Sequence, residues 1–363
     1  MWWISAPSYL PLLRMQADWV GELSRRFHES LTGGASVSVW SHGQEVLTIC
    51  AGDRWTRDTL VPVFSATKPA SALCLLLALH DCGRGPELEV GELWPAFPAP
   101  RCTVAELLSH QCGLAALAET APLTDLDACR AAIERSVPAW LPPKHGYHPQ
   151  TFGPLVDILM LQLTGMRVGA FWEQRIRRPL NLDFFIGLPE SEFHRVAPLQ
   201  APRIRPGYMA QDAFYRAYFD TRSSVYRAFH SIEGFGTPRE MSTPGAWQCA
   251  SPAKGGVASA RGLAQFYQYL MSDFVPPAVR EWLSVPRCSG WDNTLQQHTS
   301  FTCGAMCEPA HLFPGGGFGH AGAGGSHAFC SPSRHLSFAY VMERMELGNL
   351  PGPRVCRLLE LLA

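Results

Sequence analysis

The chain has no long apolar run and no excess of charge of either sign. Its uninterrupted apolar stretches all fall short of the roughly 18 residues that a membrane-spanning helix needs, so no transmembrane segment is predicted. The 30 basic and 31 acidic residues leave a net charge of -1, with no long block of one sign. This balance argues against nucleic-acid binding and against attachment to an anionic membrane surface.

Motifs for metals, dinucleotides and one common hydrolase architecture are also missing. There is no CxxC and no HExxH, and Cys303 and Cys307 form a pair without a second pair. Residues 317–322 match GxGxxG, but these glycines lead into a strand-like run instead of following a strand and opening a helix. GxSxG is absent, which argues against an α/β-hydrolase elbow. The sequence therefore predicts neither a metal site nor a cofactor.

The cysteines and the first residues of the chain indicate that the protein is located in the cytoplasm. The twelve cysteines are scattered through apolar segments, as at Cys74, Cys249 and Cys330, without the regular spacing of a disulfide framework. Residues 1–7 contain no basic region followed by a long apolar stretch, so no signal peptide is predicted. We expect buried, reduced thiols in a cytoplasmic protein.

The segment Val63-Phe64-Ser65-Ala66-Thr67-Lys68 is the most informative feature that is present, because it contains an SxxK motif. On a helix of about 3.6 residues per turn, Ser65 and Lys68 share one face and are close enough to exchange a proton. A lysine can activate a serine only where burial or nearby positive charge lowers its pKa. Residues 70–80 are almost wholly apolar, which predicts a helix buried on all sides and a dry environment for Lys68.

An SxxK also occurs by chance in chains of this length, so its partners must be sought downstream. Tyr147 lies in a predicted loop, just before an amphipathic helix expected from Pro154 to Gly165. A tyrosine in such a loop is also a common packing residue. His320-Ala321-Gly322 stands where the third motif of SxxK enzymes, a KTG-type edge strand, is expected. Ser65, Tyr147 and His320 follow one another in the order that these enzymes require.

At this point the chain resembles the serine β-lactamase-like hydrolases, which comprise class C β-lactamases, DD-peptidases and family VIII carboxylesterases. The resemblance extends from about Ala35 to the end of the chain. Besides the three motifs, it rests on stretches similar to that family's recurring segments, at residues 55–60, 103–114, 179–183, 255–259 and 338–342.

The resemblance implies a role for each matching residue. It makes Ser65 the acylated nucleophile and makes Lys68 and Tyr147 the general-base pair, leaving open which of the two accepts the proton in acylation. It places His320 at the third-motif position. It also implies an oxyanion hole formed by the backbone N–H groups of Ser65 and Ala323, with Gly322 and the glycines after it letting the strand approach a substrate.

Three positions depart from the family pattern. Pro149 replaces the asparagine whose amide contacts a lactam or peptide substrate, and His320 replaces a lysine suited to a substrate carboxylate. Both changes point towards small neutral esters. Pro69 follows the catalytic lysine, and its ring would crowd the Ser65 carbonyl unless the first helical turn is tightened or displaced.

The coarse pattern of elements predicts an α/β (α+β) fold of the β-lactamase/transpeptidase type. A helix near Gln16 to Leu31 and a hairpin of Ala35 to Trp40 with Glu45 to Cys50 come first. The C-terminal third repeats the strand pattern and ends in a helix around Pro353 to Leu362. Helical periods dominate the middle, where Thr103 and Glu106 are predicted to form the capping box that begins one helix and Gly113 to close it. We therefore expect one domain of residues 1–363, with an antiparallel sheet built from both termini and flanking helices (1–67 and 242–363) and a mostly helical subdomain inserted between them (68–241).

Three functions fit these observations. The first is a carboxylesterase that forms an acyl-enzyme on small-molecule esters. The second is a β-lactamase or DD-peptidase, and the third is a weakly catalytic protein that uses the same fold as an interaction scaffold, which Pro69 favours. The aromatic segment from Ala210 to Glu233 is either a wall of the acyl pocket or part of the core.

Overall fold

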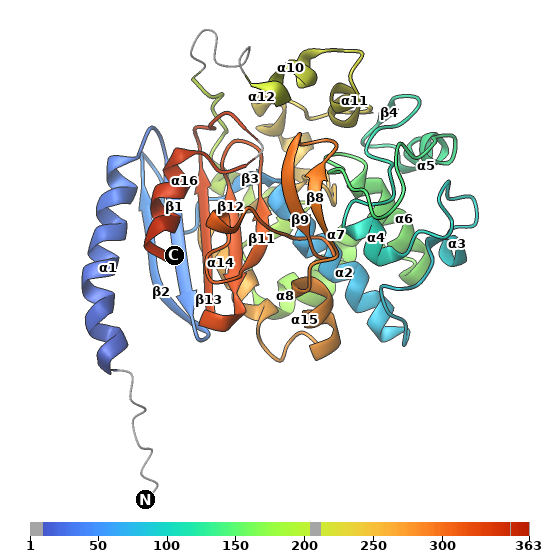
Figure 1. The fold of residues 1–363 in the computed structure, drawn as a ribbon. Coiled ribbons are helices and arrows are strands. Elements are labelled where there is room, and N and C mark those ends of the chain that lie inside the picture. Colours follow the sequence, from blue (N-terminus) through green and yellow to red (C-terminus); the bar gives the residue numbers. More distant parts are fainter. Residues whose placement is uncertain (1–9, 204–211, 349, 363) are drawn as a thin grey trace, which may run out of the picture.

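The computed structural model describes residues 10–203, 212–348 and 350–362, and its main element is an eight-stranded antiparallel sheet (Figure 1). The strands follow the spatial order β2 (Gln44–Ala51), β1 (Ala35–Ser41), β13 (Leu336–Met342), β12 (His327–Ser331), β11 (Phe318–Ala321), β10 (Met306–Glu308), β9 (Gln297–Phe301) and β8 (Cys288–Asp292).

Strands from the two ends of the sequence, β1 and β13, pair with each other near one edge of this sheet. Strand β1 pairs antiparallel with β2 on one side and with β13 on the other, so that Val37 lies opposite both Ile49 and Tyr340. The predicted hairpin and the predicted sheet of both termini are thereby confirmed. The division into a sheet-containing and a helical subdomain stays a prediction.

The two faces of the sheet are covered by different helices. Along β13, Phe338 and Tyr340 join the hydrophobic cluster that includes residues of α1 (Leu10–Glu29) and α16 (Pro353–Leu359), as expected from the alternation of side chains along a strand. Ala339 and Val341 join the other main cluster, together with α14 (Ala260–Leu270). A short 3-10 turn, Glu360–Leu362, follows α16. Figure 1 shows α1 and α16 on one side of the strands, with α14 behind them.

A small antiparallel sheet leads into the helical part of the molecule. Its order is β3 (Val61–Phe64), β7 (Gly256–Ala258) and β5 (Phe184–Ile186), and a two-stranded parallel pair joins β4 (Ala121–Pro122) to β6 (Ile232–Glu233). The helices of this part are α2 (Lys68–Asp81), α3 (Val90–Leu93), α4 (Val104–Leu108), α5 (Leu126–Glu134), α6 (Phe152–Thr164), α7 (Val168–Trp172), α8 (Arg178–Leu180), α10 (Ala213–Phe219), α11 (Ser224–His230), α12 (Pro238–Met241), α13 (Pro244–Gln248) and α15 (Pro277–Ser284).

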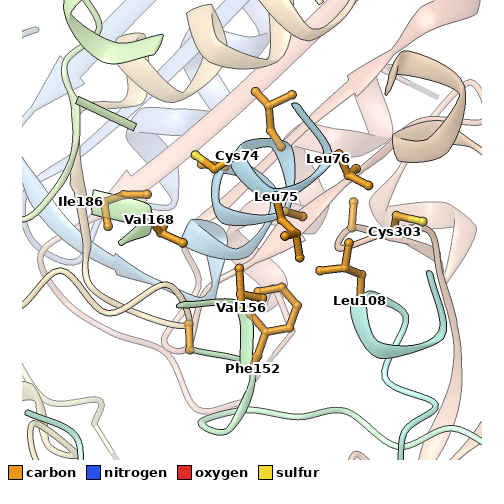
Figure 2. Packing of buried hydrophobic residues seen from close by; sticks show 14 of the residues in the cluster. Cys74, Leu75, Leu76, Leu108, Phe152, Val156, Val168, Ile186 and Cys303 are labelled. Carbon is orange, nitrogen blue, oxygen red and sulfur yellow. The ribbon is translucent and has the colours of Figure 1, made fainter. Parts of the chain in front are cut away.

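Helix α2 forms the centre of the larger hydrophobic cluster. Every residue from Lys68 to Leu79 is buried, which confirms the prediction of a helix enclosed on all sides. Figure 2 shows Leu75 and Leu76 of α2 surrounded by side chains from other elements, among them Leu108 of α4 and Phe152 of α6. This close packing fixes the helix that carries the SxxK motif.

Other local predictions had mixed outcomes. Helix α6 ends at Thr164 with Gly165 in the left-handed conformation (φ 70°), and the predicted capping box of Thr103 and Glu106 starts α4. The prediction that Gly113 closes that helix was wrong, because α4 already ends at Leu108. The third-motif strand was also expected at an edge, but β11 lies inside the sheet because β10, β9 and β8 extend it further.

Within the described ranges, no single helix has the length and apolar composition to span a membrane. Among the described helices, α6 and the helical stretch Val168–Leu180 meet both conditions only when taken together, as a pair bent by 66°.

Candidate active site

A sharp turn at the end of β3 presents Ser65. Phe64, the last residue of the strand, has a φ of 48°, an unfavourable value for a residue with a side chain. Ser65–Thr67 then form a 3-10 turn in which the Lys68 N–H bonds to the Ser65 carbonyl, and α2 begins at Lys68. Pro69 therefore occupies the first turn of α2, where a proline needs no N–H. The tightened turn accommodates Pro69 and removes the observation that favoured an inactive scaffold.

The side chain of Thr67 locks this turn to the small sheet. Its hydroxyl donates to the Phe64 carbonyl and accepts the Gly256 N–H at 2.9 Å. A Cβ at position 256 would lie 2.5 Å from the Thr67 hydroxyl oxygen, so β7 comes this close only because the residue is glycine.

Lys68 is fully buried and makes three polar contacts. Its Nζ lies 3.1 Å from Ser65 Oγ, 3.1 Å from the Pro149 carbonyl oxygen and 3.0 Å from the Ala253 carbonyl oxygen. Burial, with a smaller repulsion from Lys254, holds the pKa of Lys68 well below its ordinary value. Pro149 has no amide side chain, and what it contributes to the site is its backbone carbonyl.

These contacts match a neutral amine. The two carbonyl oxygens can only accept hydrogen bonds, so they take the two N–H groups of an uncharged lysine. In that neutral form the remaining lone pair can point to Ser65 Oγ, 3.1 Å away, and accept its proton. The arrangement has the geometry of a nucleophile within reach of its general base.

Tyr147 lies in the loop before α6, as predicted, and its ring covers the amine of Lys68. The Lys68 Nζ is 4.8 Å from the centroid of this ring, and the ring of Phe301 stacks parallel to it at 6.0 Å. The Tyr147 hydroxyl is buried, and no described group lies in a position to form a hydrogen bond with it. Ser65 is nevertheless near enough to lower the pKa of Tyr147. Burial has the larger effect and raises the pKa of Tyr147.

His320 projects from β11 next to Tyr147, with a ring-centroid separation of 5.7 Å. Burial and the neighbouring Lys68 lower the pKa of His320 to about 3, so its imidazole is neutral near pH 7. Its Nδ1 lies 2.6 Å from the Ala321 carbonyl oxygen and therefore carries the proton. The buried Nε2 is then an acceptor, and it has no partner among the described residues.

The glycines of the third motif pack against protein. A Cβ at Gly322 would lie 2.1 Å from the Val63 carbonyl oxygen, and one at Gly324 would lie 2.4 Å from the Met345 side chain. The expectation that these two glycines make room for a substrate was therefore wrong. Gly322 instead allows the end of β11 to approach the end of β3, which brings the segment carrying Ala323 towards Ser65.

Sequence reasoning missed a shell of residues that hold Tyr147. The buried carboxylate of Asp292 accepts the Tyr147 backbone N–H at 3.0 Å. The ring of His110 packs 4.9 Å from that of Tyr147, and its Nδ1 accepts the backbone N–H of His148 at 3.2 Å. His110 lies in one of the family-like stretches, which is a signal that could have found it. Asp292 has no local motif, and only the tertiary fold brings it to Tyr147.

The described side chains form neither a disulfide nor a metal site. All twelve cysteines are free thiols, and seven of them are buried. Within residues 10–203, 212–348 and 350–362, no three His, Cys, Asp or Glu side chains are grouped so as to hold a metal ion.

The aromatic segment forms a surface layer that we call the cap, consisting of α10 and α11, at the top of Figure 1. Its aromatic rings pack mainly on one another, with Phe229 5.6 Å from Phe214 and 5.3 Å from Tyr218. No residue of α10 is buried. The cap is thus only partly buried, and Ser224 and Arg227 of α11 line a cavity of about 220 Å³ together with Trp140. Ala210, where the segment was expected to start, lies outside the described residues.

Comparisons with known proteins agree with this geometry. A protein-family model described as Beta-lactamase matches residues 23–353. The chain is 30% identical over 347 residues to the Esterase/beta-lactamase LipL of Mycobacterium tuberculosis (strain ATCC 25618 / H37Rv), covering 86% of this chain and 77% of that protein.

Solved structures similar to this chain include a penicillin-binding protein homolog from Caulobacter crescentus and a family VIII carboxylesterase. The first has 30% identity and a TM-score of 0.80, with 95% of this chain and 96% of that chain covered. The second has 25% identity and a TM-score of 0.81, with 99% and 98% covered.

Proposed function

The chain belongs to the beta-lactamase family, and we propose that it is a serine carboxylesterase that forms an acyl-enzyme at Ser65 and acts on small neutral esters. The observation that carries the proposal is the contact of 3.1 Å between Ser65 Oγ and a buried Lys68 amine whose other partners are two carbonyl oxygens.

In acylation, the lone pair of Lys68 accepts the hydroxyl proton while Ser65 Oγ forms a bond to the ester carbonyl carbon. The negative charge that develops on the carbonyl oxygen is stabilised by the backbone N–H groups of Ser65 and Ala323, each contributing about 3 kcal/mol. When the tetrahedral intermediate collapses, the bond to the alkoxy oxygen breaks and the proton passes to the departing alcohol. Tyr147, beside the amine, is placed to relay this proton.

In deacylation, a water molecule replaces the alcohol. The Lys68 and Tyr147 pair takes its proton as the water oxygen attacks the acyl carbon, and Ser65 Oγ leaves with a proton returned from the same pair. The step releases a carboxylic acid and restores the free enzyme without a metal or a cofactor.

The polarity of the site favours a neutral substrate. His320 is uncharged near pH 7 and presents an acceptor nitrogen, so it offers no cation to a substrate carboxylate. Pro149 offers no side-chain amide to a lactam or peptide. A neutral ester needs neither a cation at position 320 nor a side-chain amide at position 149.

A β-lactamase is the second candidate, because a relative that is 30% identical is named Esterase/beta-lactamase. Comparing the rates with a chromogenic cephalosporin and with a p-nitrophenyl ester separates the two functions. The proposal predicts that the ester is hydrolysed faster.

The deciding experiment compares the full-length protein with Ser65→Ala on p-nitrophenyl butyrate, together with intact-mass analysis and fluorophosphonate labelling. We expect turnover and an adduct on the wild type only. If the wild type has no turnover and no label, Ser65 is not an activated nucleophile. If Ser65→Ala retains full turnover, hydrolysis occurs at another residue.

A further inference from the structure

Lys254 is buried in the molecule, although lysine is rarely buried in proteins. The chain has only three lysines, Lys68, Lys144 and Lys254, and only Lys144 is exposed. The Lys254 side chain belongs to the turn before β7 and forms no ion pair with any described residue. Removing an ammonium group from water is costly, so this position needs a compensating interaction.

The compensation comes from two successive carbonyl groups. The Lys254 Nζ donates to the carbonyl oxygen of Gly234 at 2.8 Å and to that of Phe235 at 3.3 Å. Both residues have positive φ values, 121° and 52°, and the second is unfavourable for phenylalanine. The ammonium therefore holds a strained loop in one conformation. We call this pair of hydrogen bonds the Lys254 clamp.

The clamped loop connects the cap to the rest of the molecule. It follows α11 and β6 and precedes α12, and the ring of Phe235 packs against both main hydrophobic clusters. Rings of the cap, Phe214 and Phe229, pack against the cluster that contains Tyr147. The position of this loop thus helps to determine how the cap packs on the cluster that contains Tyr147.

The turn that carries Lys254 also contacts the catalytic lysine. The carbonyl oxygen of Ala253, the residue before Lys254, accepts a hydrogen bond from Lys68 Nζ, and that of Pro252 accepts one from the Ser71 hydroxyl on α2. The turn that carries Lys254 therefore also orients Lys68. Lys254 adds positive charge near Lys68, which makes protonation of Lys68 less favourable.

We propose that Lys254 is a positioning residue, whose ammonium fastens the Gly234–Phe235 loop beneath the cap to the turn that orients Lys68. The proposal rests on the serine hydrolase function described above. Lys254 does not touch the reacting atoms, and it acts through Lys68 and through the cap.

Other groups around these lysines also affect how they titrate. Lys68 faces Tyr147 from the loop before α6, His110 from the loop after α4 and His320 from β11. Lys254 is influenced by Cys249 and by Glu240 of α12, and its burial lowers its pKa to about 8. A test must therefore compare variants of Lys254 itself and leave these groups unchanged.

Three substitutions separate the charge of Lys254 from its hydrogen bonds. Lys254→Met removes both, Lys254→Gln keeps a donor without charge, and Lys254→Arg keeps the charge and donors. The pH dependence of kcat/KM on p-nitrophenyl butyrate is the main measurement. We expect the acid limb to move to higher pH by about one unit in the Met and Gln variants and to stay in place in the Arg variant. Only the Met variant should also raise KM several-fold, because its cap is no longer held.

Lys144→Met is the matched control, because it removes the exposed lysine. It should leave the pH profile and KM unchanged. An acid limb at the wild-type pH in both Lys254→Met and Lys254→Gln would overturn the effect on Lys68. If the Met variant does not fold, the Gln and Arg variants still decide this point.

Limited proteolysis with chymotrypsin tests the clamp without relying on activity. Cleavage within the aromatic cap, residues 213–230, should be several-fold faster in Lys254→Met than in wild type and unchanged in Lys144→Met. Equal cleavage rates in the wild type and in a folded Lys254→Met would overturn the clamp. If instead the wild type lacks turnover dependent on Ser65, the proposed function fails while the proteolysis result still stands.

Discussion

The carboxylate of Asp292 on β8 fastens the backbone of Tyr147, which lies 145 positions earlier in the chain. One of its oxygens, Oδ1, accepts the N–H groups of Tyr147, Thr294 and Leu295, at 3.0, 2.8 and 2.8 Å. The other, Oδ2, accepts the Thr299 hydroxyl at 3.0 Å. The far edge of the large sheet thereby positions the tyrosine of the candidate active site.

Replacing Asp292 should affect both stability and catalysis. Asp292→Ala leaves three buried N–H groups without an acceptor, and each lowers the free energy of unfolding by about 1–3 kcal/mol. It also releases the Tyr147 loop. Asp292→Asn keeps an oxygen for these donors and should recover most of the activity. Urea unfolding and kcat measured on both variants check this. Equal loss in the two variants would mean that the charge matters and the acceptor oxygen does not.

Tyr147→Phe should separate activity from stability. The hydroxyl is buried without a hydrogen-bond partner in the described structure, so its removal should leave the unfolding free energy unchanged or slightly higher. Turnover should fall by about 10²- to 10⁴-fold, because the proton relay is lost. Tyr269→Phe on α14 is the control and should keep full activity. A large drop in stability would show that the hydroxyl has a structural partner.

Acid should destabilise the protein through its buried histidines. Burial lowers the pKa of His327 to about 4 and that of His320 to about 3, from an ordinary value of 6.5. Between pH 6.5 and 4 the unfolded chain binds protons that the folded protein does not, so the free energy of unfolding falls as the pH falls. Each histidine contributes a slope of about 1.4 kcal/mol per pH unit in this window.

The variant His327→Gln tests this slope outside the catalytic site. Urea unfolding at several pH values should show a weaker dependence on pH than in wild type. His194→Gln removes an exposed histidine and should leave the slope unchanged. Identical slopes in wild type and His327→Gln would show that His327 is protonated in the folded protein.

Gly322→Ala should disrupt the junction between β11 and β3. Its Cβ would lie 2.1 Å from the Val63 carbonyl oxygen, and a backbone atom cannot move aside as a flexible side chain does. We expect a loss of at least about 1–3 kcal/mol in stability and a marked loss of turnover. Gly21→Ala in α1 has no atom within 4 Å of its Cβ and should instead stabilise the protein, by about 0.5–1 kcal/mol. Thermal unfolding of both variants checks the pair, and a stable, active Gly322→Ala would contradict the close approach.

Local sequence patterns were sufficient for several elements of the fold. The apolar run after Lys68 predicted α2, and alternation with turn residues predicted the β1–β2 hairpin and β13. The capping box of Thr103 also identified the start of α4. These features depend on neighbours within one or two turns of the chain, so the sequence carries them directly. The end of α4 was misjudged because Gly113, with a φ of 72°, lies in a bend of the chain beyond the end of the helix at Leu108.

The linear sequence determined the fold type and the spacing of Ser65 and Lys68, since both follow from local periodicity and recognisable motifs. Only the tertiary structure decided what surrounds them: the carbonyls of Pro149 and Ala253, the carboxylate of Asp292 and the clamp of Lys254. Every residue type except proline offers the same backbone N–H and carbonyl groups, so no motif reveals which of them will meet a distant side chain. Long-range packing alone brings these groups together and, by burying Lys68, lowers its pKa.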